Sequence, residues 1–587
     1  MVYNEVLREA VIMAKKNNDI PSIVVKEIVF NNEKRLEFNK DDIVLLVGPN
    51  NVGKSRTLKD LRGDLNESSK PKLLVKDVKY ESTGFSEEQL RDYFERNITK
   101  SSYGGYNVFL DDNDSFTFND HNFINIENEK IFYKAMFSFL STENRLGLTK
   151  PIKFYFEIDK QNLKIMEKLD TDSESINSLN KAINLGFQKS VEVYEDYLDG
   201  NMVKKYKIGE SNEIASIIES NKRDSLSKLK QFEDLHNQGD GIRNAVAILA
   251  SLIVNEHSLF LIDEPETFLH PPQAKILGKN IVRLSTDKQV FISTHNIDFI
   301  RGVLEEDSSR VKIIKIDRHD NDNTFSLINN DSISDISNDK NLKYTNILNG
   351  LFYNQVILCE NESDCKFYSA ILEYEESVIY QNSLFCAVGG KEQFKKIVPL
   401  LKELNIEYKI IADIDLISNR ESLKQLLSSI ESQCYKKIEE QHKQFLESFE
   451  MEMNSQVKTQ EMIKNEIKQV FNDEKYMSPQ AAERIKTILR DVSSLKLLKS
   501  GGKNIIPQGE CVALFNEIKE FLTEHNVFIL ECGEIERLVP EIKGHGNTWV
   551  EKTFTKYRDI DNDVYDKARR FISNIFKKKL ILPQNKR

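Results

Sequence analysis

A short run near the N-terminus carries the clearest chemistry in the sequence. Residues 48–55 read Gly-Pro-Asn-Asn-Val-Gly-Lys-Ser and directly follow the apolar run Ile43–Val47. The glycines permit a tight turn whose backbone N–H groups point at phosphate oxygens, while the lysine reaches the β- and γ-phosphates and the serine hydroxyl binds Mg²⁺. The pattern therefore predicts a nucleoside triphosphate site. The residues expected to contact the nucleotide are Gly48, Asn50, Asn51, Gly53, Lys54, Ser55 and Arg56.

A second group of residues is suited to hydrolysing that nucleotide. Asp263 and Glu264 follow the apolar run Leu259–Ile262, so a strand would deliver Asp263 to the Mg²⁺ ion and Glu264 to the attacking water. His295 follows the strand expected over Lys288–Ser293 and suits a contact with the γ-phosphate. An acidic turn alone is an ordinary surface feature. Beside a phosphate loop it favours hydrolysis.

Carboxylates also follow several predicted strands in the second half of the chain. These acids are Glu360, Asp364, Asp413, Asp415, Glu534 and Glu536. Open α/β sheets bind ligands at the carboxyl ends of their strands, and all-oxygen ligands suit Mg²⁺ or Mn²⁺. Each acid alone is more often a solvated strand end or a helix cap. Together they predict a two-metal site that hydrolyses phosphodiester bonds.

Strands alternate with helices around both groups, which predicts α/β domains with parallel sheets. The chain has 587 residues, too many for one hydrophobic core. We expect a first domain over 1–345, with an insertion at about 66–235 that decorates it or makes a dimer contact. A second domain spans 346–587, with a helical insertion at about 421–505.

Composition indicates a soluble globular protein, with 40% hydrophobic and 30% charged residues. No apolar run is long enough to span a bilayer, and the charged residues 1–20 contain no signal-peptide core. We expect a cytoplasmic protein without a membrane partner. None of the six cysteines forms a C-x-x-C pair or has a histidine at zinc-finger spacing. The cysteines therefore predict buried thiols in a reducing compartment rather than a structural metal site.

The net charge of −11 argues against nucleic acid as a partner, but local charge is a better guide than the total. Lys567–Arg587 contains basic residues and no acid, and Arg484–Lys503 is also net basic. Either segment could follow a DNA backbone. Solvated helix faces explain each run equally well.

Two motifs resemble the ABC-type ATPases of the SMC/RecF/OLD group: the acidic run Asp263–Pro271, Asp-Glu-Pro-Glu-Thr-Phe-Leu-His-Pro, and Ser293–Asn296. The resemblance makes the Asp-Glu pair a Walker B motif and His295 the switch histidine. Gly239, Asp240 and Gly241 stand where the group carries its signature motif, although the wording departs from Ser-Gly-Gly. The resemblance implies that two chains sandwich ATP, giving a homodimer through the ATPase domains or a tetramer built on it.

The later acids resemble the TOPRIM fold, which has a Glu after its first strand and an Asp-x-Asp after a later one. Gly389-Gly390-Lys391 resembles its glycine turn, whereas Asn361 replaces the Gly that usually follows the Glu. An ABC-type ATPase followed by TOPRIM is the arrangement of OLD-family nucleases, including the Gabija nuclease and retron-associated effectors. The resemblance covers neither insertion. It implies two metal ions and a C-terminal lysine that assists at the scissile phosphate, for which Lys567 is the candidate.

The leading hypothesis is an ATP-regulated, Mg²⁺- or Mn²⁺-dependent DNA endonuclease. The resemblance alone implies a role in anti-phage defence, with a reverse transcriptase and its DNA product as partners in the retron-like version, or a helicase in the Gabija-like version. A nucleotide-switched DNA clamp or sensor without nuclease activity is the first alternative. A primase or strand-passing enzyme is the second, although no nucleophilic tyrosine domain is recognisable.

Overall fold

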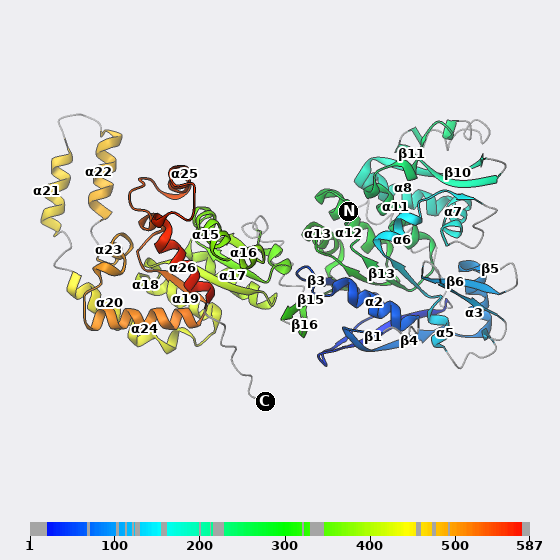
Figure 1. Ribbon diagram of the computed structural model, residues 1–587, viewed down its shortest axis with the longest axis horizontal. Helices are drawn as coiled ribbons and strands as arrows, with labels where there is room; N and C mark the ends of the chain where they lie inside the picture. The colour runs from blue at the N-terminus through cyan, green and yellow to red at the C-terminus, as the bar shows by residue number, and fades with distance from the viewer. Residues whose placement is uncertain are drawn as a thin grey trace. The chain divides into compact units, whose positions relative to one another are not determined.

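The computed structural model describes most of the chain as two compact units, residues 1–337 and 338–587 (Figure 1). The described residues are 20–577 without 67–70, 101–104, 112–113, 120–121, 124–128, 154–160, 199–200, 212, 215–227, 320–321, 329–345, 454–458, 472–476 and 491–493. The predicted domain boundary at 345 and the last part of the basic C-terminal run, 578–587, lie outside them. Within the described residues, no helix is both long and apolar enough to cross a membrane.

A six-stranded sheet in the order β16-β15-β3-β14-β13-β8 forms the centre of the first unit. Its strands are β3 (Ile43–Val47), β8 (Phe137–Leu140), β13 (Leu259–Asp263), β14 (Gln289–Ser293), β15 (Val311–His319) and β16 (Asp322–Ile328). All neighbours pair in parallel except β15 and β16. Every residue of β3 and β14 is buried, as expected for parallel strands covered on both faces.

Three smaller sheets complete the strands of the first unit. They contain β1 (Ser22–Phe30), β2 (Arg35–Glu37), β4 (Val75–Thr83), β5 (Thr99–Lys100), β6 (Tyr106–Asp111), β7 (Asp114–Phe118), β9 (Ile152–Lys153), β10 (Lys189–Leu198), β11 (Asn201–Glu210) and β12 (Glu233–Asp234). The helices are α2 (Lys54–Leu65), α3 (Glu87–Asn97), α5 (Lys130–Tyr133), α6 (Thr142–Gly147), α7 (Gln161–Thr171), α8 (Ser173–Phe187), α11 (Asp240–Val254), α12 (Pro271–Leu284) and α13 (Ile297–Asp307).

The segment at 66–235 is more than the decoration that the sequence predicts. Strand β8 pairs with β13 along Phe137–Leu140, so this segment supplies the edge of the central sheet. Strand β4 pairs with β1 and contributes to the same hydrophobic core as β3. The short strand β8 was missed because its mixed sequence, Phe-Ser-Phe-Leu, lacks the continuous apolar run that marks the other parallel strands.

The second unit is built on a four-stranded parallel sheet in the order β18-β17-β19-β20. Its strands are β17 (Gln355–Cys359), β18 (Ser383–Ala387), β19 (Glu407–Asp413) and β20 (Val527–Leu530). Cys359 pairs with both Ala387 and Ile411, and Asp413 pairs with Leu530. This register brings the carboxyl ends of the strands to one edge of the sheet, where the predicted acids follow them.

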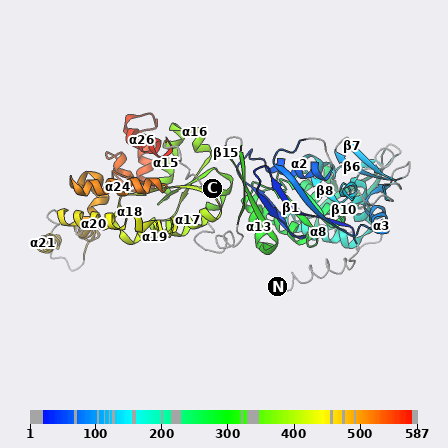
Figure 2. The same ribbon diagram turned by 90° about the horizontal axis from the view of Figure 1, so that it is seen from below.

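Helices flank this sheet and fill the long connection between β19 and β20. They are α15 (Glu362–Glu375), α16 (Ser377–Gln381), α17 (Phe394–Glu403), α18 (Asp415–Ser418), α19 (Arg420–Ile430), α20 (Glu439–Met453), α21 (Gln460–Val470), α22 (Pro479–Arg490), α23 (Ser494–Gly501), α24 (Glu510–Glu524), α25 (Gly546–Lys556) and α26 (Asp566–Lys577). Helices α21 and α22 pack together as a hairpin, and α20 lies beside α24 (Figures 1 and 2). The segment predicted as a helical insertion, at about 421–505, contains this hairpin.

Candidate active sites

The phosphate loop joins β3 to α2 through backbone conformations that favour glycine. Gly48 has a φ of 145° and Gly53 a φ of 102°, and Asn51 between them has a φ of 64°. A Cβ atom on Gly53 would lie 2.3 Å from Cδ1 of Leu74, and one on Gly48 would lie 2.2 Å from the Ile316 carbonyl oxygen. Both positions thus need glycine for conformation and for space.

Lys54 begins α2 and is buried under the loop. Its Nζ donates hydrogen bonds of 2.9 Å to the carbonyl oxygens of Gly48 and Pro49, which hold the ammonium inside the turn. Burial lowers the pKa of Lys54, while the carboxylates of Glu264 and Glu266 act in the opposite direction. A buried ammonium with acids across the loop fits the phosphates and metal of a bound nucleotide.

The other residues predicted to contact the nucleotide differ in their burial and in their hydrogen bonds. Asn50 is exposed and Ser55 is partly buried in the first turn of α2. The side chain of Arg56 is held elsewhere, because its Nε donates to Asp60 Oδ1 at 2.8 Å and its Nη2 to the Pro71 carbonyl at 2.7 Å. The structure therefore gives Arg56 a role in fixing the chain after α2, and its contact with nucleotide stays a prediction.

Asp263 and Glu264 lie at the carboxyl end of β13, next to the end of β14. Asp263 pairs with Ser293 in the sheet and accepts a hydrogen bond from its hydroxyl. The backbone N–H of Glu264 donates to the Ser293 carbonyl at 3.0 Å, and Glu264 itself has a φ of 48°. The turn thus holds both acids at the end of the strand, which is the position predicted for a metal ligand and a water-polarising base.

His295 completes the acidic end of β14. Its Nδ1 lies 3.5 Å from Glu264 Oε1 and 3.4 Å from Glu266 Oε1. The hydrogen bond between His295 and Glu264 raises the pKa of the histidine and lowers the pKa of the glutamate. Glu264 is therefore kept ionised, which is the state that accepts a proton from water.

Arg145 supports this turn and was missed in the sequence. It lies in α6, is fully buried, and donates from Nη2 to the Glu264 carbonyl at 3.0 Å and from Nη1 to the carbonyls of Asp263 and Leu140. Burial lowers its pKa to about 10, so the guanidinium stays charged at neutral pH. No motif marks an arginine more than a hundred residues before the acids, because only the pairing of β8 with β13 brings it there.

The expected signature residues cap α11. Gly239 is the N-cap, and Asp240 Oδ1 accepts from Arg243 Nη1 at 2.8 Å. A Cβ atom on Gly241 would lie 2.6 Å from the Phe268 carbonyl oxygen, so α11 approaches the loop after β13 closely. Its N-terminus offers backbone N–H groups for an anion, and the contact of this terminus with the nucleotide of a second chain stays a prediction.

The first group of acids in the second unit meets at the ends of β17 and β19. One oxygen from each of Glu360, Asp413 and Asp415 lies within 4.8 Å of the others. The backbone N–H groups of Gly389 and Gly390 donate to the Glu360 carbonyl at 3.0 and 2.9 Å, so the glycine turn fixes the residue that bears the carboxylate. Asp415 Oδ1 is buried without a hydrogen-bond partner among the described residues.

Without a bound cation, the surroundings of these carboxyl groups favour their protonated form. Burial, together with the charge of Asp415, raises the pKa of Glu360 to about 7. Burial and the charge of Glu360 raise the pKa of Asp413 well above its usual range. Converging buried carboxylates with an unpartnered oxygen fit a divalent cation, whose charge removes the repulsion between them.

A second group of possible metal ligands follows β20 in the sequence. Glu534, Glu536 and His545 each offer a ligand atom within 4.8 Å of the other two. Glu536 also accepts from the Gly546 N–H at 2.9 Å. Asp364 lies in the first turn of α15, where it caps that helix, and burial raises its pKa with a contribution from Glu536. Five of the six predicted acids thus fall into two groups, and His545 joins the second. Asp364 belongs to neither group but interacts electrostatically with Glu536 and with Asp413.

Two family models match the parts of the chain that carry the two candidate sites. Residues 43–301 match the family described as "AAA domain, putative AbiEii toxin, Type IV TA system", and residues 351–415 match "Overcoming lysogenization defect protein-like, TOPRIM domain". The chain belongs to the OLD family. The predicted fold class, an ABC-type ATPase domain followed by a TOPRIM domain, is confirmed.

The OLD-family chain is also similar to individual proteins over part of its length. The Old nuclease of Escherichia phage P2 is 26% identical over 171 residues, which are 28% of this chain and 28% of that protein. An Smc head bound to the C-terminal winged-helix domain of ScpA matches at 12% identity with a TM-score of 0.31, covering 52% of this chain and 98% of the other. The SMC head domain from Thermotoga maritima matches at 12% identity with a TM-score of 0.27, covering 52% and 99%.

Two lysines of this OLD-family protein contact the first acidic group. Lys391 Nζ lies 2.9 Å from Asp415 Oδ2, and Lys499 Nζ lies 3.4 Å from Asp413 Oδ2. Partial burial opposes the charge of Lys499, but the nearby acids, with Asp413 first, outweigh it and raise its pKa. Sequence reasoning had named Lys391 only as part of the glycine turn, and Lys499 only within a net basic run.

Lys567, the lysine singled out in the sequence, lies at the start of α26 in the same unit. It is exposed in the first turn of α26, and its charge acts on the thiol of Cys532. Among the described residues, no ion pair or hydrogen bond joins Lys567 to the acidic groups. Lys499 therefore contacts the first acidic group directly, and the assignment of Lys567 stays a prediction.

Proposed function

We propose that this protein is an ATP-regulated, metal-dependent DNA endonuclease whose TOPRIM unit hydrolyses phosphodiester bonds. The observation that carries the proposal is the convergence of Glu360, Asp413 and Asp415 within 4.8 Å, with a buried and unpartnered oxygen on Asp415. Hard carboxylate oxygens in this arrangement suit Mg²⁺ or Mn²⁺. A phosphate loop and a Walker B pair in the same chain support nucleotide control.

The two acidic groups give each metal ion its own ligands. Glu360, Asp413 and Asp415 would hold one ion, and Asp364, Glu534 and Glu536 a second. Divalent ions held there supply an activated water and stabilise the leaving oxygen of the phosphodiester. Lys391 and Lys499 carry positive charge at the border of the first group, where they attract and orient the phosphate backbone of a substrate.

Each of the ATPase residues has a different role in ATP hydrolysis. Lys54 neutralises phosphate charge, while Ser55 and Asp263 bind Mg²⁺. Glu264, kept ionised by its hydrogen bond with His295, accepts a proton from the attacking water. In the assembly we propose, Gly239, Asp240 and Gly241 at the start of α11 contact the γ-phosphate held by a second chain, so that ATP closes a homodimer or a tetramer built from such dimers.

The proposed cellular role and partners rest on the family resemblance alone. Anti-phage defence is the process we propose, with DNA as substrate. A reverse transcriptase with its DNA product, or a helicase, is the proposed partner. Domain limits of 1–345 and 346–587 remain part of the same proposal.

The test is cleavage of plasmid and linear DNA by the purified full chain with Mg²⁺ or Mn²⁺, with and without ATP. The Asp413→Ala/Asp415→Ala variant should lose cutting. An Asp559→Ala/Asp563→Ala variant is the matched control, because it removes two exposed acids of the same unit that lie outside both acidic groups. Equal cutting by wild type and the first variant would place the activity elsewhere. A wild-type protein that binds DNA without cutting it would favour the clamp.

A further inference from the structure

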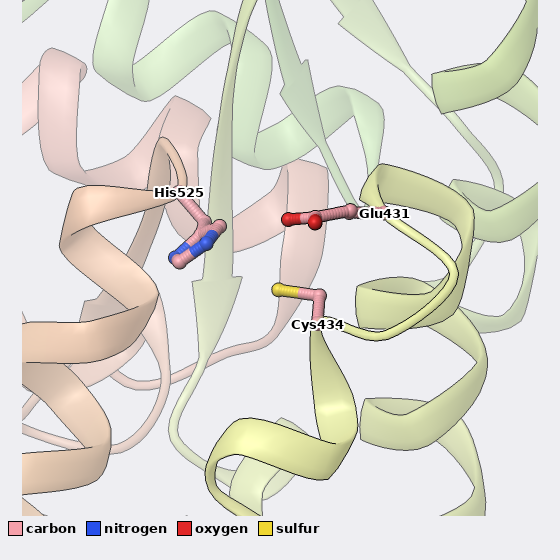
Figure 3. A group of neighbouring side chains, drawn as sticks. All are labelled: Glu431, Cys434 and His525. Carbon is pink, nitrogen blue, oxygen red and sulfur yellow. The ribbon is translucent and has the colours of Figure 1, made fainter. Parts of the chain in front are cut away.

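A third cluster of metal-ligating side chains lies apart from both acidic groups of the TOPRIM unit. Glu431, Cys434 and His525 each offer a ligand atom, and the three atoms lie within 4.8 Å of one another. Figure 3 shows the Glu431 carboxylate and the Cys434 sulfur directed toward the His525 ring. The proposed nuclease uses none of these residues.

The backbone presents the first two ligands from one tight turn. Helix α19 ends at Ile430, Glu431 is its C-cap, and the Cys434 N–H donates to the Glu431 carbonyl at 2.9 Å. This turn places the glutamate and cysteine side chains three positions apart on the same side. The Cys434 thiol is fully buried, whereas Glu431 is exposed and also lies 3.2 Å from Lys437 Nζ.

The third ligand comes from the other end of the long connection between β19 and β20. His525 is the C-cap of α24, just before β20 begins at Val527. Its Nδ1 lies 2.8 Å from the Phe521 carbonyl oxygen. A carbonyl can only accept, so Nδ1 carries the proton and the lone pair is on Nε2. Metal-binding histidines are usually oriented in this way, with the second ring nitrogen donating to a carbonyl or carboxylate.

The donor set selects a class of metal different from that of the nuclease site. A thiolate, an imidazole and a carboxylate are ligands of Zn²⁺ and related transition metals, and three such ligands leave the fourth tetrahedral position to water. The acidic groups, in contrast, offer carboxylate oxygens and one histidine. Sequence spacing could not reveal this site, because Cys434 and His525 are about ninety residues apart.

We propose that Glu431, Cys434 and His525 form a Zn²⁺ site that ties the end of α19 to the end of α24. On binding, the Cys434 thiol loses its proton to solvent and the sulfur forms a bond to the metal. The ion cross-links the two ends of the helical connection that carries Lys499. It thereby holds the start of β20, the strand that leads to Glu534 and Glu536.

The experiment uses the full chain. Wild-type protein purified from zinc-supplemented medium should contain about one Zn²⁺ per chain. Exchange of this ion for Co²⁺ should produce a near-ultraviolet thiolate-to-cobalt charge-transfer band. Cys434→Ser should abolish the band. Cys511→Ser is the matched control, because it removes another buried thiol of the same unit that lies outside the cluster, and it should keep the band.

Two further variants separate this site from the nuclease site. The Asp413→Ala/Asp415→Ala variant should keep the cobalt band, because carboxylates give no thiolate transition, while His525→Gln should lose or strongly weaken it. Zinc removal should lower the melting temperature of wild type and leave that of Cys434→Ser unchanged. Wild type without zinc and without a cobalt band overturns the proposal, whether or not the variants fold. A band that survives Cys434→Ser overturns it as well.

Discussion

The ammonium nitrogen of Lys499 lies 3.4 Å from Oδ2 of Asp413, although the lysine belongs to α23 of the helical connection and the acid to the end of β19. The connection therefore contributes to the site rather than only extending from it. A positive charge at this position compensates the acids in the same way as a metal ion does. If the proposed metal ion binds Asp413, Lys499 competes with it for the same carboxylate, and this competition is measurable.

Replacing Lys499 by Ala should strengthen binding of Mn²⁺ to the free protein. A charge pair at 4 Å is worth about 4 kcal/mol at an effective dielectric constant of 20. The side chain of Lys499 is 42% exposed, so solvent screening reduces this contribution. We expect about tenfold tighter binding, or roughly 1.4 kcal/mol, in a calorimetric titration with Mn²⁺. Unchanged or weaker binding would show that Lys499 does not compete with the metal.

The control for this measurement is Lys503→Ala. Lys503 lies in the same net basic run but pairs with Glu531 at 3.1 Å, outside the acidic groups. It removes the same charge from the same region, so its Mn²⁺ affinity should stay close to that of wild type. If both variants bind Mn²⁺ more tightly, the effect comes from net charge rather than from the contact with Asp413.

The raised pKa of Glu360 makes the metal-free stability depend on pH. Its pKa is about 7 in the folded chain and near 4.5 when unfolded, so the folded state holds the extra proton between these values. Stability from this group is present below pH 4.5 and is lost as the pH rises toward 7. The loss is at most about 3 kcal/mol, at 1.36 kcal/mol for each pKa unit.

Denaturant unfolding without metal at pH 5 and pH 7.5 measures this dependence. Wild type should lose more stability between the two values than Glu360→Gln, which has no proton to release. Glu362→Gln, an exposed neighbour, should behave as wild type does. The same proton must leave before a metal binds, so Mn²⁺ affinity should rise with pH up to about 7. Equal pH dependence in wild type and Glu360→Gln would contradict the assigned pKa.

Arg145→Ala should separate ATP binding from ATP hydrolysis. The variant removes the Arg145 donor from the carbonyl oxygens of Asp263 and Glu264. The Glu264 carbonyl still accepts from the Thr267 hydroxyl and backbone N–H, so the cost of about 1–3 kcal/mol for a lost buried hydrogen bond falls mainly on the Asp263 carbonyl. A turn displaced by about 1 Å slows chemistry by roughly a hundredfold. Nucleotide affinity should change little, because Lys54 is intact.

Steady-state ATP hydrolysis and binding of a fluorescent nucleotide test this expectation together. Arg301→Ala is the control, since Arg301 forms a partly exposed pair with Asp298 on α13. Hydrolysis at the wild-type rate in Arg145→Ala would mean that the guanidinium has no part in placing the acids. Loss of nucleotide binding would instead show that Arg145 supports the phosphate loop as well.

Lys54→Ala should abolish ATP binding, because the phosphates lose both a charge and a hydrogen-bond donor. Equilibrium titration with labelled ATP measures the change. Lys59→Ala removes an exposed lysine from the same helix and should bind as wild type does. Unchanged affinity in Lys54→Ala would refute the assignment of residues 48–55 as the phosphate loop.

The sequence predicted the elements that bury both faces or carry a motif. The apolar run Ile43–Val47 has the bounds of strand β3. The run Leu259–Ile262 and the strand expected over Lys288–Ser293 agree with β13 and β14 to within one residue, because continuous apolar runs mark parallel strands. The acids at their carboxyl ends followed from the same pattern. Strand β8 was missed because its residues alternate and its partner β13 lies far along the chain.

Residues that act through tertiary contacts could not be found in this way. Arg145, Lys499 and His525 reach their partners only after distant segments pack, and each carries no local pattern. Lys567 was selected from its position near the C-terminus, and its assignment stays a prediction for a lysine that lies exposed in α26. Motifs predict the residues that contact the substrate. The charged residues that change the pKa or the position of those residues can be found only from the fold.

The most direct test of the central claim measures DNA cleavage and ATP hydrolysis in parallel on the Asp413→Ala/Asp415→Ala variant. If the two acids act in phosphodiester hydrolysis, the variant loses metal-dependent DNA cleavage and still hydrolyses ATP at close to the wild-type rate. Cleavage that continues at the wild-type rate in a variant that is folded and hydrolyses ATP would contradict the claim that this TOPRIM unit is the nuclease.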